Sequence, residues 1–224
     1  PSFDINGWDA AHKALILAML AYGTPLNTDK IAVYGIERVE SVDFKLADQL
    51  GYTIKLLVVI KHHADKDALE LRVQPSFVPK EYLLAKVDGV FNAIAVKGDI
   101  VGETIFYGRG AGKLPTASAV VADVIDEVKH LKARKYLYWG PREEGHVRDS
   151  RLAPTRLLLR FSCEEDAGAL VQIGRVFGDV RMVTIPDAPD NEVAFITPCM
   201  PEYLLNEKIA GFTGMTLTRR LRMY

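Results

Sequence analysis

Apolar residues recur along the first half of the chain with the spacing of helices and strands. The run at 14–21 is apolar on every face and predicts a buried helix, for which Asn6 and Gly7 supply the cap and first turn. We expect six further elements, namely a short helix, four strands and a long helix, at 43–50, 53–61, 69–78, 92–96, 104–107 and 115–131. Pro75 and Pro79 indicate that the second strand frays or lies at a sheet edge. Strands framed by helices, without repeated alternation, predict an α+β fold.

The second half follows a polar segment at 132–155 that is bracketed by prolines. Its elements are expected in the order β-α-β-β-α-β, which is the ferredoxin-like pattern, at 156–161, 167–177, 180–185, 192–197, 201–211 and 215–222. We therefore predict a first domain at 1–140, a linker at 141–155 and a second domain at 156–224.

Composition and charge narrow the classes of function. The 224 residues are 49% hydrophobic and 25% charged, with a net charge of −1, which is ordinary for a globular protein. No basic stripe favours a nucleic-acid partner, and no polybasic patch favours a membrane. The longest apolar run is far below the ~20 residues that span a bilayer, and no leader is visible, so we expect a cytoplasmic protein. The two cysteines stand alone and His62–His63 lacks a third ligand, so no metal site is expected.

Three charged residues stand around the start of the apolar helix: Asp4, Asp9 and Lys13. Asp9 and Lys13 are four residues apart, so their side chains share one face of the helix at its accessible end. In one interpretation, Asp9 completes a capping box and forms a surface ion pair with Lys13, worth about 0.3–0.5 kcal/mol. In the other, the carboxylate orients an ammonium that transfers a proton.

The glycines at 108, 110 and 112 also allow two interpretations. Their spacing matches neither the dinucleotide fingerprint Gly-x-Gly-x-x-Gly nor a P-loop. They suit a tight turn from a strand into a helix, with Pro115 at the first helical position. They equally suit a close approach of the backbone to a ligand at a helix N-terminus.

Four stretches, in order, carry a resemblance to a known family. Residues 4–13 are Asp-Ile-Asn-Gly-Trp-Asp-Ala-Ala-His-Lys, and residues 106–123 are Phe-Tyr-Gly-Arg-Gly-Ala-Gly-Lys-Leu-Pro-Thr-Ala-Ser-Ala-Val-Val-Ala-Asp. Between them stand Leu-Gly-Tyr-Thr-Ile-Lys-Leu-Leu at 50–57 and Val-Asp-Gly-Val-Phe-Asn-Ala-Ile at 87–94. Together they resemble the homoserine dehydrogenase family over residues 4–131.

This resemblance implies an NAD(P)H-dependent interconversion of L-aspartate 4-semialdehyde and L-homoserine, in threonine and methionine biosynthesis. It implies a catalytic, substrate-binding and dimerisation domain built as a mixed sheet with helices on one side, in a homodimer or homotetramer. Lys13 would be the proton donor and acceptor, with Asp9 as its catalytic partner, and Asp4 would join both in binding the substrate. Gly110, Gly112 and Thr116 would contact the cofactor, either NADP or NAD.

The second half is similar to the ACT regulatory domain, on its element order and on Glu-Asp-Ala-Gly-Ala-Leu at 165–170, where Ala167 replaces the usual Pro. The resemblance implies threonine as a candidate effector. No Gly-x-Gly-x-x-Gly occurs, so we expect a fragment that lacks the N-terminal dinucleotide-binding domain and is inactive alone. The alternative is a non-catalytic, amino-acid-sensing ACT module on a dimer scaffold.

Overall fold

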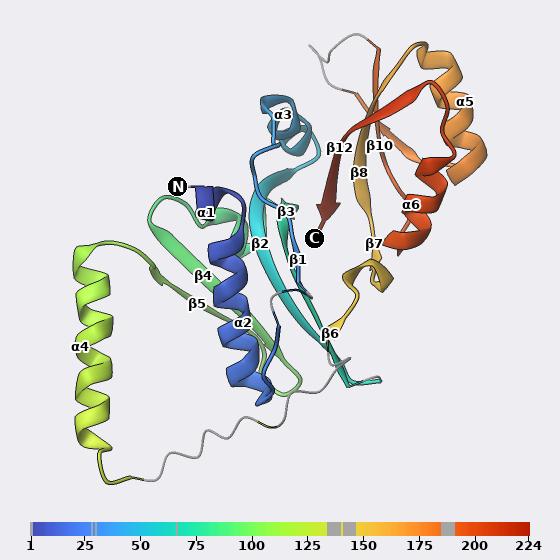
Figure 1. Ribbon diagram of the computed structural model, residues 1–224. Helices are drawn as coiled ribbons and strands as arrows, with labels where there is room; N and C mark the ends of the chain where they lie inside the picture. The colour runs from blue at the N-terminus through green and yellow to red at the C-terminus, as the bar shows by residue number, and fades with distance from the viewer. Residues whose placement is uncertain are drawn as a thin grey trace. The chain divides into compact units, whose positions relative to one another are not determined.

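The computed structural model describes residues 2–27, 29, 31–65, 67–133, 140, 147–184 and 191–224. The described residues form two compact units, one from the ranges Pro1–Pro79 and Trp139–Tyr224 and the other from Lys80–Tyr138 (Figure 1). Each unit contains its own β-sheet.

The first unit is built on a mixed sheet of eight strands among its described residues. They are β1 (Ala32–Val33), β2 (Tyr52–His63), β3 (Ala68–Pro79), β6 (Val147–Arg148), β8 (Leu157–Cys163), β9 (Arg181–Val183), β10 (Glu192–Ile196) and β12 (Met215–Met223). Their order is β1-β3-β12-β8-β10-β9, with β2 and β6 also paired to β3. β1, β6 and β12 run parallel to β3, whereas β2 runs antiparallel to it. Strands β7 (Pro154–Thr155) and β11 (Met200–Pro201) form a separate short pair.

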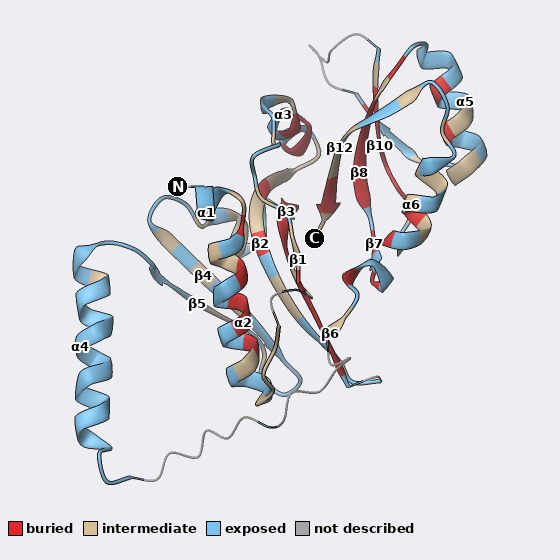
Figure 2. Ribbon diagram, viewed as in Figure 1, coloured by how far each residue is buried: buried red, intermediate tan, exposed pale blue. Residues whose placement is uncertain are grey.

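The described helices of this unit are α1 (Ser2–Ile5), α2 (Trp8–Tyr22), α3 (Ser41–Gln49), α5 (Asp166–Phe177) and α6 (Glu202–Ala210), with the 3-10 turn η3 (Ser150–Leu152). Four of them, α2, α3, α5 and α6, pack on the two faces of the sheet. α2 packs on alternate residues of β3, such as Leu69 and Leu71, and α3 packs on Phe77 of that face and on Leu158 of β8. α5 and α6 pack on Leu157 and Leu159, which point to the opposite face. Figure 2 shows the buried residues concentrated in these strands and on one side of α2. The predicted mixed sheet with its helices on one side is confirmed for α2 and α3.

The C-terminal elements follow the predicted β-α-β-β-α-β order, as β8, α5, β9, β10, α6 and β12. Within the sheet they stand in the order fourth, first, third, second, and successive neighbours are antiparallel. The last of them, β12, also pairs with β3, so strands from both predicted domains share one sheet. The division at 141–155 stays a prediction, and residues 141–146 of that linker lie outside the described residues.

Three local expectations are wrong. Pro75 lies in the interior of β3, and β3 is paired on both edges. The strand tolerates a proline there because the pairing with β1 ends at Val73 and the pairing with β12 begins at Ser76, so no ladder hydrogen bond is required of residue 75 on that edge. Gly7, not Asn6, is the N-cap of α2. That helix is also buried on one face only, because β2 and β3 cover a single side of it and leave Ile16 exposed.

The second unit contains a hairpin of β4 (Phe91–Gly98) and β5 (Gly102–Arg109), the 3-10 turn η2 (Leu83–Lys86) and α4 (Lys113–Lys129). The rings of Phe91 and Tyr107 stack across the hairpin at 4.9 Å between centroids. No described residue of α4 is buried. Pro115 is the third residue of α4, where a missing N–H still costs no helical hydrogen bond.

Among the helices that the structure describes, none is long and apolar enough to cross a bilayer.

Candidate active site

The N-terminal end of α2, which we call the mouth of α2, is held against the sheet by the turn at Gly7 between α1 and α2. We call this turn the corner. Gly7 turns the corner with φ 86°, a left-handed conformation that favours glycine. A Cβ atom at Gly7 would lie 3.2 Å from Cγ1 of Val73 and 3.3 Å from Cγ1 of Val33, so the corner packs closely on β1 and β3. The Ile36 N–H donates to the Ile5 carbonyl over 2.9 Å and ties α1 to the chain after β1. The first turn of α2 is therefore fixed relative to the sheet.

Asp9 and Lys13 meet on this first turn. Nζ of Lys13 donates to Oδ2 of Asp9 over 2.6 Å, and the side chains are 70% exposed for Lys13 and 39% for Asp9. An ion pair this open to water contributes little to folding, typically about 0.2–1 kcal/mol. The pair presents an oriented ammonium to solvent on a rigid helix. The helix N-terminus favours the carboxylate of Asp9.

Asp4 lies on α1, one turn before the corner, and is exposed. Its carbonyl accepts a hydrogen bond from the Gly7 N–H over 3.2 Å. Asp4 contributes to the corner, and its side chain is open to solvent.

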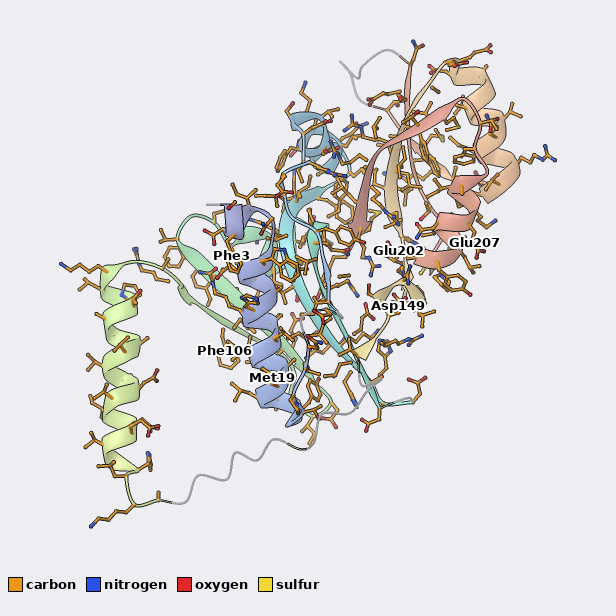
Figure 3. All side chains as sticks on the ribbon, viewed as in Figure 1. Phe3, Met19, Phe106, Asp149, Glu202 and Glu207 are labelled. Atoms are coloured by element: carbon orange, nitrogen blue, oxygen red, sulfur yellow. The ribbon has the colours of Figure 1, made fainter. Side chains whose placement is uncertain are left out.

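Three aromatic rings, those of Phe3, Trp8 and His12, form a group beside the ion pair. The rings of Phe3 and Trp8 lie 5.3 Å and 6.4 Å from the imidazole of His12, measured between centroids. All three residues are exposed, and Figure 3 labels Phe3 at the start of the chain. Trp8 and His12 are four residues apart, and that spacing is the signal that could have found the group. His12 adds a second titratable side chain next to Lys13.

The glycine turn lies in the second unit, between β5 and α4. The Gly110 N–H donates to the Val90 carbonyl over 3.2 Å, and a Cβ atom at Gly110 would lie 1.7 Å from Nδ2 of Asn92. Gly112 is the N-cap of α4 with φ 121°, and its carbonyl accepts from the Thr116 N–H over 3.1 Å. Gly112 therefore supplies a positive φ at the start of α4, and a side chain at position 110 would displace that of Asn92. Asn92, which fills the space beside Gly110, was missed, because nothing local in the sequence links the two positions.

The structure brings together the sequence-predicted residues in two groups. Asp9 and Lys13 are in direct contact in the first unit, and Gly110, Gly112 and Thr116 form one turn in the second. That the two groups serve one reaction stays a prediction.

Other reactive side chains have structural partners. The Cys163 thiol donates to Oδ1 of Asp166 over 3.2 Å, and burial raises the pKa of Cys163 to about 11, with Asp166 adding to the effect, so the thiol is held protonated. Nε2 of His63 lies 3.0 Å from Oε2 of Glu70. Among the described residues, no three histidines, cysteines or acidic side chains are grouped closely enough to hold a metal ion.

Comparison with known proteins shows which family the chain is similar to. A model of the family described as homoserine dehydrogenase matches residues 1–125. The chain is 56% identical over 176 residues to a homoserine dehydrogenase of Helicobacter pylori, covering 79% of this chain and 41% of the relative. It is 52% identical over 232 residues to a homoserine dehydrogenase of Neisseria gonorrhoeae, covering 96% and 52%.

A solved structure shares the fold over the whole chain. The crystal structure of a homoserine dehydrogenase from Thiobacillus denitrificans superposes with a TM-score of 0.86 at 33% identity, covering 100% of this chain and 54% of that one. The chain thus spans about half the length of the relatives that it matches.

Proposed function

Because the chain belongs to the homoserine dehydrogenase family, we propose that it serves the NAD(P)H-dependent interconversion of L-aspartate 4-semialdehyde and L-homoserine. The observation that carries the proposal is the 2.6 Å contact of Lys13 with Asp9 at the mouth of α2, inside the matched region. A purely sensing role is not favoured, because this family is one of dehydrogenases and the chain retains that acid–base pair.

Lys13 acts on the oxygen of the substrate. In the reductive direction its ammonium donates a proton to the aldehyde oxygen as that oxygen becomes a hydroxyl, and in the oxidative direction the amine takes the proton back. Asp9 orients the ammonium through the existing hydrogen bond, and Asp4 binds the substrate's amino group together with Asp9.

Gly110, Gly112 and Thr116 would hold the cofactor, either NADP or NAD, which supplies or accepts the hydride when bound. The support for cofactor binding here is the geometry of the turn between β5 and α4. Gly112 has no side chain to keep a ligand from the backbone, and Lys113, Leu114 and Thr116 in the first turn of the 17-residue α4 are exposed.

Calorimetric titration with L-homoserine tests the role of Lys13. We expect saturable binding to the wild-type chain, and a loss of about tenfold or more in affinity for Lys13→Met, since a hydrogen bond to a charged group is removed. Lys129→Met, at the far end of α4, is the matched control. Equal affinities for the two variants would refute the proposal.

Turnover is a separate measurement. The 224 residues contain no Gly-x-Gly-x-x-Gly, so we expect no oxidation of NADPH with the semialdehyde by this chain alone. A coupled assay that detects turnover would overturn that expectation without weakening the role of Lys13.

The C-terminal elements support an ACT domain at 156–224, following a catalytic domain at 1–140 and a linker at 141–155. Its support is the β-α-β-β-α-β order and the arrangement of β12, β8, β10 and β9. We propose threonine as the effector, bound near residues 165–170 at the start of α5.

Two glycines of α5 provide a matched test of the threonine site. A Cβ atom at Gly168 or at Gly174 would meet no heavy atom within 4 Å, so Gly168→Ala and Gly174→Ala should both fold. Gly168→Ala is expected to abolish calorimetric binding of L-threonine, because it fills the proposed site, whereas Gly174→Ala should leave it intact. Binding that survives in both variants would exclude this location.

We also propose a homodimer or homotetramer in the cytoplasm. The hairpin β4–β5 exposes large apolar side chains, among them Ile94, Val96 and Phe106, which a second copy would cover. Both cysteines are free thiols, which suits a reducing compartment. Light scattering during size-exclusion chromatography should give a mass of at least twice 24.9 kDa, and a monomer at micromolar concentration would refute the assembly.

A further inference from the structure

The short strand β6 is attached to the sheet near the start of β3. Its residues Val147 and Arg148 pair in parallel with Leu69 and Glu70, close to the turn that joins β2 to β3 (Figure 1). Both residues of β6 lie in the predicted linker at 141–155, so this pairing fixes part of that linker to the sheet. Because a ladder of two residues is shorter than an ordinary strand, side-chain contacts should contribute much of the attachment.

One such contact joins Arg148 to the imidazole of His63, the last residue of β2. Nη1 of Arg148 lies 3.3 Å from Nδ1 of His63, and Nε2 of the same ring lies 3.0 Å from Oε2 of Glu70. An arginine can only donate hydrogen bonds, and an ionised carboxylate can only accept them. Nδ1 is therefore the acceptor and Nε2 carries the hydrogen, so the two contacts require a neutral His63 in one tautomer.

The surroundings of His63 also favour its neutral form. Its side chain is 13% exposed, and burial, followed by the positive charges of Arg148 and Lys61, lowers the pKa of His63 below its ordinary 6.5. The charge of Asp65 opposes this shift, and that of His62 adds to it. The ring is still partly exposed, so protons from solvent can reach it.

Glu70 would favour a protonated His63, but its charge is already shared with arginines. Its side chain is 1% exposed and forms an ion pair with Arg72, and Nη1 of Arg222 lies 3.9 Å from its Oε1. A second ring proton, on Nδ1, would point at the cation Arg148 and not at Glu70. Protonation of His63 therefore costs the hydrogen bond from Arg148 and places two positive charges side by side.

We propose that His63 makes the attachment of β6 proton-sensitive: the neutral imidazole holds β6 on β3 through Arg148, and protonation of Nδ1 releases Arg148 and loosens β6. Nε of Arg148 is buried and, among the described residues, has no hydrogen-bond partner, so losing the bond to His63 leaves this guanidinium poorly compensated where it lies.

The direction of the pH dependence follows from the lowered pKa of His63. The attached form is fully favoured above pH 6.5, and this preference is lost as the pH falls through the pKa of the attached form. The contact involves none of the residues assigned to catalysis or to the threonine site, so it does not depend on the proposed function.

Hydrogen exchange of backbone amides measures how often β6 opens. The whole chain is labelled at pH 7.5 and at pH 5, with labelling times scaled to the intrinsic exchange rate at each pH. We expect protection of peptides that contain 147–152 to fall about tenfold at pH 5, the effect of one lost hydrogen bond to a charged group. Peptides from the hairpin β4–β5 are the internal reference. Equal protection of the β6 peptides at the two pH values would overturn the proposal.

His63→Asn is the informative variant. The amide oxygen of asparagine can take the place of Nδ1 as acceptor for Arg148, and it does not protonate in this pH range, so β6 should stay protected at pH 5. His62→Gln is the control, because the exposed ring of His62 contacts Asp67 and Tyr22, and it should keep the pH dependence of the wild type. A fall in protection that persists in His63→Asn would contradict the role of His63.

Nitrogen-15 NMR of the histidine rings in the wild-type chain gives a second measurement that depends on no substitution. At pH 7.5 we expect the ring of His63 to carry its hydrogen on Nε2, with Nδ1 unprotonated. The opposite tautomer, or a ring already protonated at pH 7.5, would overturn the proposal.

Discussion

Two carboxylate–cation contacts in the first unit share the same chemistry and differ in burial. Asp9 and Lys13 meet at the open mouth of α2, whereas Asp43 of α3 meets Arg160 of β8 over 2.5 Å with its side chain fully buried. The buried contact is part of a network, because Nε of Arg219 lies 3.1 Å from Asp43 and Arg160 also pairs with Glu192 over 2.8 Å. The comparison teaches that burial separates a pair that holds the fold from a pair whose ammonium is open to solvent.

The largest effect is expected for Asp43→Ala. Removing this carboxylate leaves the buried guanidinium of Arg160 short of a partner and removes the acceptor for the Glu40 N–H, over 2.9 Å, in the capping box of α3. Breaking a buried pair in this way costs about 3–5 kcal/mol in the free energy of unfolding, measured with urea. Asp48→Ala, exposed on the same helix, is the control, and a loss below about 1 kcal/mol for Asp43→Ala would contradict the structural role.

Gly7→Ala should have the next largest effect, because it disturbs the corner that positions Asp9 and Lys13. The left-handed φ of 86° costs a residue with a Cβ atom about 1–2 kcal/mol, and contacts with Val73 and Val33 add to it. Gly51→Ala is a control with nearly the same φ, 82°, and no heavy atom within 4 Å of the new Cβ. Unfolding in urea should show a larger loss for Gly7→Ala, and equal losses would mean that the corner is loosely packed.

Glu40, whose side chain is 55% exposed, lies at the edge of this network and predicts a dependence of stability on pH. Burial opposes ionisation of Glu40, but hydrogen bonds and charges from Arg219 and Arg160 outweigh it and lower the pKa of Glu40 below its ordinary 4.5. A lowered pKa stabilises the fold above pH 4.5, and this contribution is lost as the pH falls through the folded-state pKa. Glu40→Gln should therefore be less stable than the wild type at pH 7, and the difference should shrink on acidification. A constant difference between pH 3 and pH 7 would contradict this.

The smallest effect on stability is expected for Asp9→Asn. Because the pair is open to water, the free energy of unfolding should change by less than about 0.5 kcal/mol. The affinity for L-homoserine should nevertheless fall in calorimetry. A loss of stability approaching that of Asp43→Ala would remove the contrast between the two contacts.

Local elements were predictable from the sequence, since they depend on periodicity and on turn residues. α2, β2, β3 and the C-terminal β-α-β-β-α-β order all follow from such patterns. The pairing of β12 with β3 was not predictable, because it joins segments far apart in the chain. Pro75 was misplaced for the same reason, since its tolerance depends on which strands flank it.

The residues of the candidate site also divide into those predictable from local sequence and those that depend on tertiary contacts. The spacing of Asp9 and Lys13 predicted their contact, because i and i+4 are neighbours on any helix. The burial of Asp43 and the packing of Asn92 beside Gly110 depend on tertiary contacts that no local pattern records. The sequence therefore predicted contacts between neighbours on one helix better than contacts between distant segments.

The most direct test of the account follows the side chain of Lys13 itself. Carbon-13 NMR of the lysine Cε signals, recorded during titration with L-homoserine, reports which ammonium the ligand meets. We expect the Lys13 signal, assigned by its loss in Lys13→Met, to shift saturably while the other lysines stay unchanged. Saturable binding that leaves Lys13 unperturbed would contradict the assignment of the mouth of α2 as the site of proton transfer.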